Sequence, residues 1–319
     1  MVRDALLRGA PHHEAGRDQW LLGPRFRGDK RASSRPRAMK AGHPEETIYN
    51  IVVVGGGSAG CGISRLIMNA MLEEGVSAED AKKHFFIIDK HGLLMDDMPD
   101  LLPFQLPFTQ SKKNTAHWSC SDFNKISLQD VITNVHPTLL IGVSGQPGIF
   151  TEDLIKIMAA HVDQPIIFPL SNPTARSEAT PNDLMRWTEE RAIVGTGSPF
   201  SNITKNGKEF RVDQTNNCYI FPGMGLGLIA VKARHVTENM FMAAAKVLAS
   251  CSPAKQDPTA NLLPALTDIR QVSFQVAVAV AKEAIQAGLA GHQPSEDLEK
   301  YIQNMMWAPE YMTYRKIIT

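Results

Sequence analysis

Three glycines with regular spacing are the first residues of this sequence that could do chemistry. Gly55, Gly57 and Gly60 form a G-x-G-x-x-G pattern that follows the apolar run 49–54 and opens a helix-like stretch. In that setting Gly55 permits a tight turn, Gly57 lets the backbone approach a pyrophosphate, and Gly60 lets the helix pack closely on a sheet. The N–H groups of the helix N-terminus would bind the phosphates. A plain tight turn is the alternative, and it is disfavoured because both flanking elements have the expected type.

An acidic residue at the end of the second strand would complete a dinucleotide site. Asp89 closes the apolar run 85–89, where its carboxylate could accept hydrogen bonds from the adenosine ribose hydroxyls. It lies further from the glycines than the usual spacing of about 20 residues, and a short helical insert at 77–83 accounts for the extra length. A carboxylate repels a 2′-phosphate, so Asp89 favours NAD. Lys90 and His91 could offset that repulsion, which keeps NADP as the less favoured alternative, and Asp89 could also be a simple turn acid.

Asparagines in two later loops could bind a small polar ligand. Asn172 follows a buried strand and precedes Pro173, which favours an extended loop. Its amide can both donate to a carboxylate and accept from a carboxamide. Asn216 and Asn217 precede another apolar segment. An isolated asparagine is usually a turn former, but the loop positions and the paired arrangement favour ligand binding here.

Short apolar strands and helix-like segments alternate from about residue 48. The strands are predicted at residues 49–54, 85–89, 138–145, 165–173 and 192–199. Gly75 is predicted to end the first helix, and Thr151 and Thr180 to be the N-caps of two later ones. This alternation predicts an α/β fold with a Rossmann-like, doubly wound, mostly parallel sheet. C-terminal helices are predicted at 237–250 and 267–288.

The chain divides into three regions by composition and patterning. Residues 1–45 are predicted to be a basic, disordered leader, with a basic arm or targeting peptide as the alternative. Residues 46–290 are predicted to form an NAD(P)-binding domain, and residues 291–319 a helical or extended tail. The 33 Lys and Arg residues balance 33 Asp and Glu residues, which argues against a nucleic-acid partner.

Neither membrane insertion nor secretion is expected. The apolar runs are too short to cross a bilayer, and the N-terminus has no apolar signal region. The four cysteines are far apart and show no C-x-x-C spacing, which predicts reduced thiols in a cytoplasmic protein.

A succession of motifs along the chain resembles those of the malic enzymes. The motifs, in order, are VVGGGSAGCGIS, IIDKHGLL, DLLPFQLPF, PTLLIGVSGQPGIFTEDLI, PIIFPLSNPTARSEATPND, VGTGSPF and NNCYIFPGMGLGLIA. The likeness covers about residues 48–319; it is greatest to the bacterial NAD-linked type, and malolactic enzymes are also similar. It implies oxidation of malate by NAD with Mg²⁺ or Mn²⁺, followed by decarboxylation to pyruvate and CO₂.

The resemblance also implies roles for individual residues. Those implied to hold the dinucleotide are Gly55, Gly57, Ser58, Gly60 and Asp89. Those implied to line the cofactor groove are Gly142, Val143 and Ser144. Asn172 and Asn216 would lie against malate and the nicotinamide, with Asn217 beside them.

The catalytic groups that the family uses are not found here. In malic enzymes a tyrosine acid, a lysine base, metal-binding carboxylates and a substrate-binding arginine all precede the glycine loop. The roughly 50 residues before Gly55 match none of those motifs, and Lys30, Lys40 and Tyr49 stand in the wrong context. No catalytic and no metal-binding residue is therefore assigned in this chain. Ser198 has no His and Asp arrangement nearby and is interpreted as a turn residue.

Three hypotheses follow. The first is a truncated NAD-dependent malic enzyme that binds NAD and malate but is inactive unless a separate catalytic half joins it. The second is a non-catalytic NAD-binding or assembly module, or a degraded gene product. The third is a malolactic enzyme fragment, since the same loops would serve both reactions. The absent half would normally cover apolar side chains, so poor solubility or a homo-oligomer is expected.

Overall fold

The computed structural model describes residues 49–205, 207–257, 259–308 and 310. The predicted leader at 1–45 lies outside these residues. No helix among the described residues is long and apolar enough to cross a membrane.

The described chain forms two compact units. Unit 1 comprises residues up to Asn216 and a second segment, Ala249–Pro264. Unit 2 comprises Asn217–Leu248 and the residues from Ala265 onward. The domain limits expected at residues 46 and 290 stay predictions.

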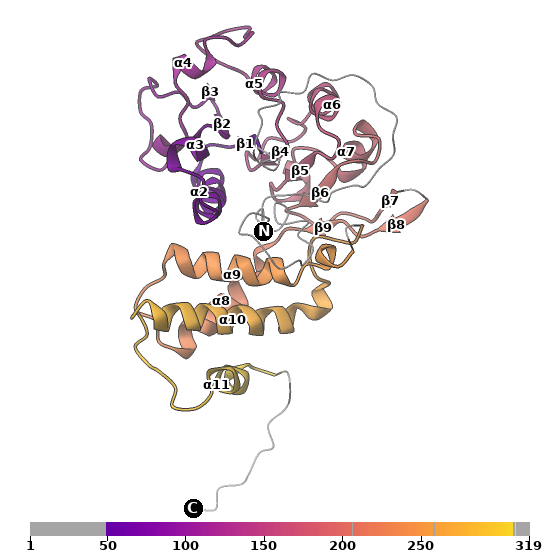
Figure 1. The fold of residues 1–319 in the computed structure, drawn as a ribbon. Helices are drawn as coiled ribbons and strands as arrows, with labels where there is room; N and C mark the ends of the chain where they lie inside the picture. The colour runs from indigo at the N-terminus through magenta and orange to yellow at the C-terminus, as the bar shows by residue number, and fades with distance from the viewer. Residues whose placement is uncertain (1–48, 206, 258, 309, 311–319) are drawn as a thin grey trace, which may run out of the picture. The chain divides into compact units, whose positions relative to one another are not determined.

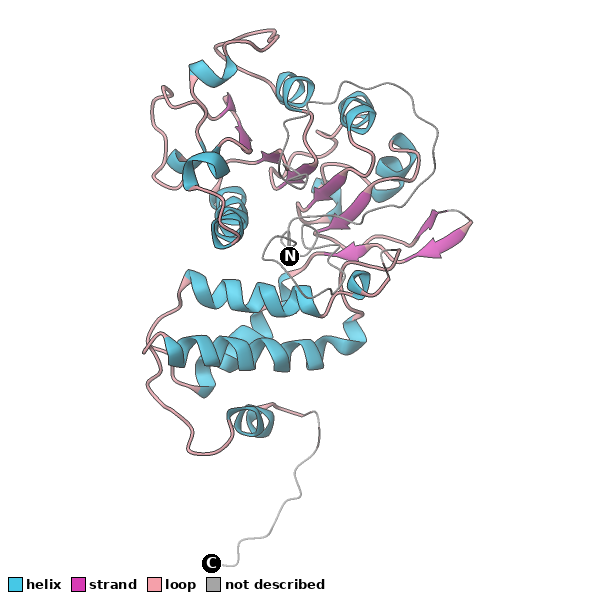
Figure 2. Ribbon diagram, viewed as in Figure 1, coloured by secondary structure: helices cyan, strands magenta, loops and turns pink. Residues whose placement is uncertain are grey.

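A seven-stranded, mostly parallel sheet forms the centre of unit 1 (Figures 1 and 2), and five of its strands were predicted from the sequence. The strand order is β3-β2-β1-β4-β5-β6-β9, and all neighbours are parallel except the β2–β3 pair. The strands are β1 (Ile51–Val54), β2 (Phe85–Asp89), β3 (Gly92–Leu93), β4 (Leu139–Gly142), β5 (Ile166–Pro169), β6 (Ile193–Thr196) and β9 (Asp213–Gln214). The two-residue strands β3 and β9 were not predicted, because two residues show no hydrophobic period.

Helices connect these strands. They are α2 (Ser58–Glu73), α3 (Ala78–Lys82), α4 (Lys112–Thr115), α5 (Leu128–Val135), α6 (Glu152–His161) and α7 (Pro181–Trp187). A separate hairpin joins β7 (Ile203–Lys205) to β8 (Lys208–Phe210). Single turns of 3₁₀-helix include η1 (Leu106–Phe108) and η2 (Thr174–Arg176).

Local signals explain most helix ends. Thr180 caps α7 by accepting a hydrogen bond from the Asp183 amide at 3.2 Å, whereas Thr151 occupies the N-cap of α6 without a side-chain bond. Gly75, two residues beyond α2, has a φ of +92° and confirms the predicted stop. Helix α5 was not predicted, although Ser127 and Asp130 form a capping box that marks its start.

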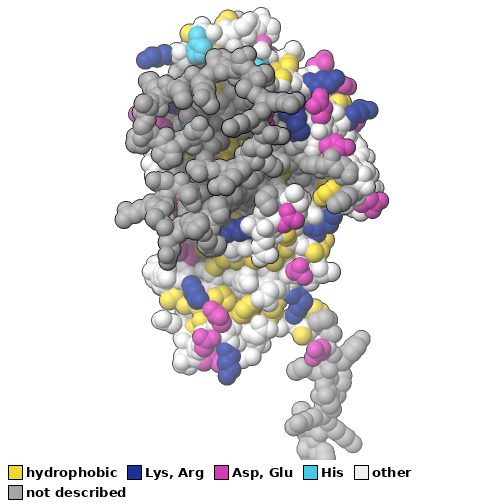
Figure 3. Space-filling model, turned by 45° about the vertical axis from the view of Figure 1, so that its right-hand side comes forward, with side chains coloured by type: hydrophobic (Ala, Val, Ile, Leu, Met, Phe, Trp, Pro, Cys, Tyr) yellow, Lys and Arg dark blue, Asp and Glu magenta, His cyan; other side chains and the backbone are white. Residues whose placement is uncertain are grey.

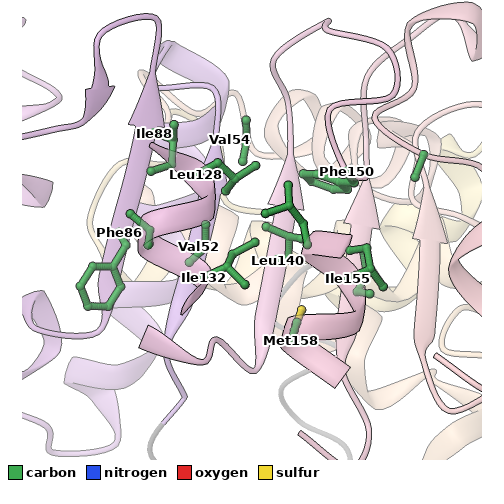
Figure 4. Packing of buried hydrophobic residues seen from close by; sticks show 14 of the residues in the cluster. Val52, Val54, Phe86, Ile88, Leu128, Ile132, Leu140, Phe150, Ile155 and Met158 are labelled. Atoms are coloured by element: carbon green, nitrogen blue, oxygen red, sulfur yellow. The ribbon is translucent and has the colours of Figure 1, made fainter. Parts of the chain in front are cut away.

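Both faces of the sheet are covered, which confirms the doubly wound fold. Val52 and Val54 belong to a buried cluster with side chains of α5 and α6 on one face (Figure 4). Val53 points to the opposite face, because successive strand residues alternate. A Cβ atom added to Gly60 in α2 would lie 3.1 Å from Val53 Cγ1, so α2 packs on that opposite face.

The second segment of unit 1 is attached through a buried carboxylate at the edge strand. Asp213 in β9 accepts hydrogen bonds from the backbone amides of Leu262 at 2.6 Å and Leu263 at 3.4 Å. The Asn261 amide and the Arg211 guanidinium also donate to Asp213, at 2.9 and 3.1 Å. Burial nevertheless raises the pKa of Asp213 above its ordinary value, because desolvation outweighs these bonds.

Unit 2 is helical. Its helices are α8 (Phe221–Ala230), α9 (Glu238–Ser250, which runs into unit 1 at Ala249), α10 (Ile269–Gln286) and α11 (Leu298–Met305). The helices predicted at 237–250 and 267–288 are thus confirmed as α9 and α10. Glycines allow α8 and α10 to approach closely, because Cβ atoms at Gly223 and Gly227 would lie 2.5 Å from Ser273 O and 2.4 Å from Ala277 O.

Candidate functional site

The glycine loop has the geometry that its spacing predicts. Gly55 has a φ of +120°, and a Cβ atom there would lie 2.6 Å from Val143 O. A Cβ atom at Gly60 would lie 2.0 Å from Gly55 O, whereas Gly57 faces open space. Gly57 is the N-cap of α2 and Ser58 its first residue, with no capping side chain at the N-terminus. The backbone N–H groups at this end of α2 are therefore available to an anion.

The loop lies at the point where the strand order reverses. From β1 the chain moves outward to β2, and after α5 it returns to β4 on the other side of β1 (Figure 1). The loops that follow β1 and β4 touch, as the contact between Gly55 and Val143 O shows. Open parallel sheets bind ligands at such a reversal, beyond the carboxyl ends of their strands.

Asp89 ends β2 beside the glycine loop, and a residue that the sequence analysis missed holds it there. Gln105 Nε2 donates to Gly56 O at 2.8 Å and to Asp89 Oδ2 at 3.3 Å. Asp89 Oδ1 accepts the backbone N–H of Lys90 at 2.8 Å. Gln105 is only 6% exposed, so its buried amide links the glycine loop to the Asp89 carboxylate from inside the protein.

Cys61 lies under the same loop. Its Sγ atom donates to Gly56 O at 3.5 Å, and the side chain is buried. Burial raises the pKa of Cys61 to about 11, with a smaller contribution from the negative charge of Asp89. The thiol is therefore protonated at neutral pH and is inert as a nucleophile.

The loops after β4 and β5 share a buried carboxylate, Glu178, which the sequence analysis also missed. Ser144 donates to Glu178 Oε1 from its backbone N–H at 2.9 Å and from its hydroxyl at 3.0 Å. Ser171 donates its hydroxyl to the same oxygen at 2.5 Å and its backbone N–H to Oε2 at 3.3 Å. Glu178 is 0% exposed. A Cβ atom at Gly142 would lie 2.5 Å from Glu178 Cδ, so Gly142 leaves space for this side chain.

Asn172 is exposed in the loop after β5, where its peptide bond to Pro173 is cis. The buried Ser198 hydroxyl donates to Asn172 Oδ1, and Asn172 Nδ2 donates to Leu170 O at 3.5 Å. The interpretation of Ser198 as a turn residue thus missed its contact with Asn172. The carboxamide oxygen thus accepts from Ser198 while the amide nitrogen donates to Leu170 O, and these two bonds fix the orientation of the Asn172 side chain.

Asn216 is placed near this loop through the β6–β9 pair. The Thr215 backbone N–H donates to Thr196 O at 2.7 Å, and Gln214 Nε2 donates to Gly197 O at 3.3 Å. These bonds set the segment ending at Asn216 beside the loop that carries Ser198. Asn217 belongs to unit 2, where it begins a 3₁₀ turn.

The structure therefore brings most of the predicted site residues to the carboxyl edge of one sheet. Within unit 1 these are Gly55, Gly57, Ser58, Gly60, Asp89, Gly142, Val143, Ser144, Asn172 and Asn216. Their assignment to NAD or malate stays a prediction. Among the described residues no three His, Cys, Asp or Glu side chains gather as a metal site. The divalent ion implied by the resemblance thus finds no fitting ligand set in the described part of the chain.

Comparison with known proteins identifies the relatives of this chain. Residues 37–285 match a family described as "Malic enzyme, NAD binding domain". Over 279 residues the chain is 48% identical to the NAD-dependent malic enzyme of Shewanella baltica strain OS185 and 47% identical to that of Shewanella frigidimarina. Each match covers 88% of this chain and 50% of the relative. The chain thus spans about half the length of the curated relatives it matches.

Solved structures agree on the fold. A malic enzyme from Entamoeba histolytica superposes with a TM-score of 0.60 at 23% identity, over 81% of this chain and 47% of that one. A malic enzyme from Pyrococcus horikoshii superposes with a TM-score of 0.56 at 22% identity, over 82% of this chain and 53% of that one.

Proposed function

Because the chain belongs to the malic enzyme family, we propose that it binds NAD and supplies the dinucleotide-binding half of NAD-dependent malate oxidation. The observation that carries this proposal is the glycine loop fixed to Asp89 by Gln105, with hydrogen bonds of 2.8 and 3.3 Å. The open N-terminus of α2 and the acidic end of β2 lie side by side there. This arrangement suits a pyrophosphate and an adjoining ribose.

The positions of the loops support one orientation of the bound dinucleotide. The adenosine ribose binds at Asp89, and the pyrophosphate binds over Gly57 and Ser58. The nicotinamide then extends toward the loops after β4 and β5, because these lie on the other side of β1 from β2. Asn172 offers an N–H donor there to a carboxamide or carboxylate oxygen of the bound ligands.

NAD is favoured over NADP by the fixed carboxylate of Asp89. Both of its oxygens accept N–H groups, which hold the carboxylate at a defined position. A 2′-phosphate placed on the same ribose would meet this negative charge. Lys90 and His91 are exposed, so solvent screens their charge and they offset the repulsion only in part.

We further propose that the chain binds NAD without oxidising malate unaided. The described residues offer no set of metal-binding side chains, and no tyrosine, lysine or arginine motif of the family's catalytic half is found before the glycine loop. The metal would polarise the oxygen of the oxidised substrate wherever its ligands are supplied. This chain's own residues bind and orient the dinucleotide.

The proposal is tested by calorimetric titration of the purified chain with NAD and with NADP. NAD is expected to bind more tightly, and malate with Mn²⁺ is expected to yield no NADH from the same sample. Lack of binding to either dinucleotide overturns the proposed function. NADH formation by the chain alone overturns the proposal that catalytic groups must come from elsewhere.

Self-association and a cytoplasmic location complete the proposal. Phe221, Ile229 and Trp307 of unit 2 are 56%, 67% and 75% exposed, and burying these apolar side chains against a second copy would favour self-association. On the face drawn in Figure 3, basic and acidic side chains are intermingled. The four cysteines form no disulfide, which is typical of a reducing compartment. Light scattering at two protein concentrations tests the association.

A further inference from the structure

We propose that Glu178 is a positioning residue that holds the loops after β4 and β5 in the arrangement that binds the nicotinamide half of NAD. This inference rests on the proposed function and adds a role for a side chain that touches no ligand itself. The observations that carry it are the burial of Glu178 and the origin of its hydrogen-bond donors.

The two loops converge on one carboxylate. From the β4 loop, Ser144 donates its N–H and hydroxyl to Glu178 at 2.9 and 3.0 Å. From the β5 loop, Ser171 donates its hydroxyl and N–H at 2.5 and 3.3 Å. The Ser171 hydroxyl also accepts the N–H of Gly145 at 2.8 Å, which closes the network between the loops. Hydrogen bonds to a charged acceptor are stronger than neutral ones, so the carboxylate is the fixed point of both loops.

The space for this carboxylate is provided by the strand itself. Gly142 ends β4, and any Cβ atom there would lie 2.5 Å from both Cγ and Cδ of Glu178. A buried carboxylate is costly unless it is fully hydrogen-bonded. Here the donors come from the segments next to Val143 and Asn172, which are predicted ligand-binding residues. A displacement of Glu178 would therefore move those two residues relative to each other.

Glu178 is expected to affect only one half of the dinucleotide. Its partners lie beyond β4 and β5, whereas Asp89 and the glycine loop lie beyond β2 and β1. The adenosine half therefore binds to residues that do not contact Glu178. Loss of the carboxylate should weaken binding of NAD and spare binding of ADP, which lacks the nicotinamide half.

The test compares Glu178→Gln with Asp130→Asn in the full chain. Asp130 is a matched control, because it is also a buried carboxylate that accepts from two serines, Ser121 and Ser127, but at the start of α5. NAD and ADP are titrated by calorimetry into the wild type and both variants, and thermal unfolding is followed by circular dichroism.

The expected result is a loss of NAD affinity of about tenfold or more in Glu178→Gln, the size of one lost charge-assisted interaction. ADP affinity stays within about twofold of the wild type, and Asp130→Asn binds both ligands as the wild type does. Ser171→Ala keeps the carboxylate but removes one of its donors and the acceptor of the Gly145 N–H, and it shows the same selective loss at smaller size. If Glu178→Gln does not fold, the NAD and ADP affinities of Ser171→Ala still test the inference.

The inference is overturned by unchanged NAD affinity in Glu178→Gln and Ser171→Ala, or by equal losses of NAD and ADP affinity in these variants. A wild-type chain that binds neither ligand overturns the proposed function instead. Failure of this inference would therefore appear in the variants, whereas failure of the proposed function would appear in the wild-type chain.

Discussion

The Gln105 amide donates a hydrogen bond to the Asp89 carboxylate at 3.3 Å while the same nitrogen donates to Gly56 O at 2.8 Å. One side chain thus fixes the acidic end of β2 to the glycine loop after β1. The two groups expected to contact the ribose and the pyrophosphate are held at a constant separation before any ligand binds. Such preorganisation lowers the entropic cost of binding.

Asp89→Asn is expected to weaken NAD binding by about tenfold, because a neutral amide replaces the charged acceptor for the ribose hydroxyls. The same change removes the repulsion of a 2′-phosphate, so the preference for NAD over NADP should narrow. Calorimetric titration with both dinucleotides measures the ratio. Asp80→Asn is the control, since Asp80 is an exposed carboxylate in α3 paired with Lys83. An unchanged ratio in Asp89→Asn would exclude Asp89 from the ribose site.

Gly60→Ala and Gly62→Ala should change stability in opposite directions, although both lie in α2. A Cβ atom at Gly60 would lie 2.0 Å from Gly55 O, so alanine there is expected to cost about 2 kcal/mol or more in the free energy of unfolding. Gly62 has no atom within 4 Å of its Cβ position, so alanine should stabilise the helix by about 1 kcal/mol. Urea unfolding measures both, and equal effects would show that α2 does not pack closely on the glycine loop.

Cys61 should resist alkylation while the protein is folded. Burial, with help from Asp89, raises the pKa of Cys61 to about 11, so at pH 8 only about a thousandth of this thiol is the reactive thiolate. Iodoacetamide labelling followed by peptide mass spectrometry is expected to leave Cys61 unmodified until urea is added. Rapid modification in the absence of urea would contradict the burial of Cys61 beneath Gly56.

Asp130→Asn should remove part of the pH dependence of stability. Desolvation alone would raise the pKa of Asp130, but hydrogen bonds from Ser127 and Ser121 lower it below its ordinary value of 3.8. The stabilisation from this carboxylate is therefore present above that ordinary value and is lost as the pH falls through the lower folded-state value. Thermal melts at pH 7 and pH 3.5 are expected to show a larger deficit for Asp130→Asn at pH 7. A deficit that grows at low pH would contradict this assignment.

Ser198→Ala should release the Asn172 amide from its fixed orientation. The Ser198 hydroxyl donates to Asn172 Oδ1, so without it the amide can turn its oxygen toward the ligand. We expect a several-fold loss of NAD affinity with a stability change of about 1 kcal/mol. Ser198→Thr keeps a hydroxyl and should retain most of the affinity. Equal affinity in the wild type and Ser198→Ala would show that this bond is not needed for binding.

The glycine loop and the five longer strands could be predicted because their signals are local. Gly55, Gly57 and Gly60 lie within six residues of sequence, and each of those strands begins with a run of apolar residues. The start of α5 was also encoded locally, by the capping box of Ser127 and Asp130, and its buried apolar residues follow the helical i, i+3, i+4, i+7 spacing, so this helix could have been predicted from the sequence.

Gln105 and Glu178 could not be found in the same way, because only the folded chain brings them to their partners. Gln105 lies 49 residues from Gly56 and 16 from Asp89, and Glu178 lies 34 residues from Ser144. Neither belongs to a strand or helix with a recognisable period. Ser198 was misjudged for the same reason, since Asn172 is 26 residues away.

The split composition of unit 1 also has a consequence for the order in which the protein is made. Asp213 is stabilised by the amides of Leu262 and Leu263, which are in the segment that follows Asn217–Leu248 of unit 2. A ribosome must therefore release that intervening stretch before the Asp213 carboxylate can accept hydrogen bonds from these two amides. Until then the edge of the sheet in unit 1 carries a carboxylate that lacks these donors, so we expect chaperone capture of the nascent chain to be most frequent during this interval of translation.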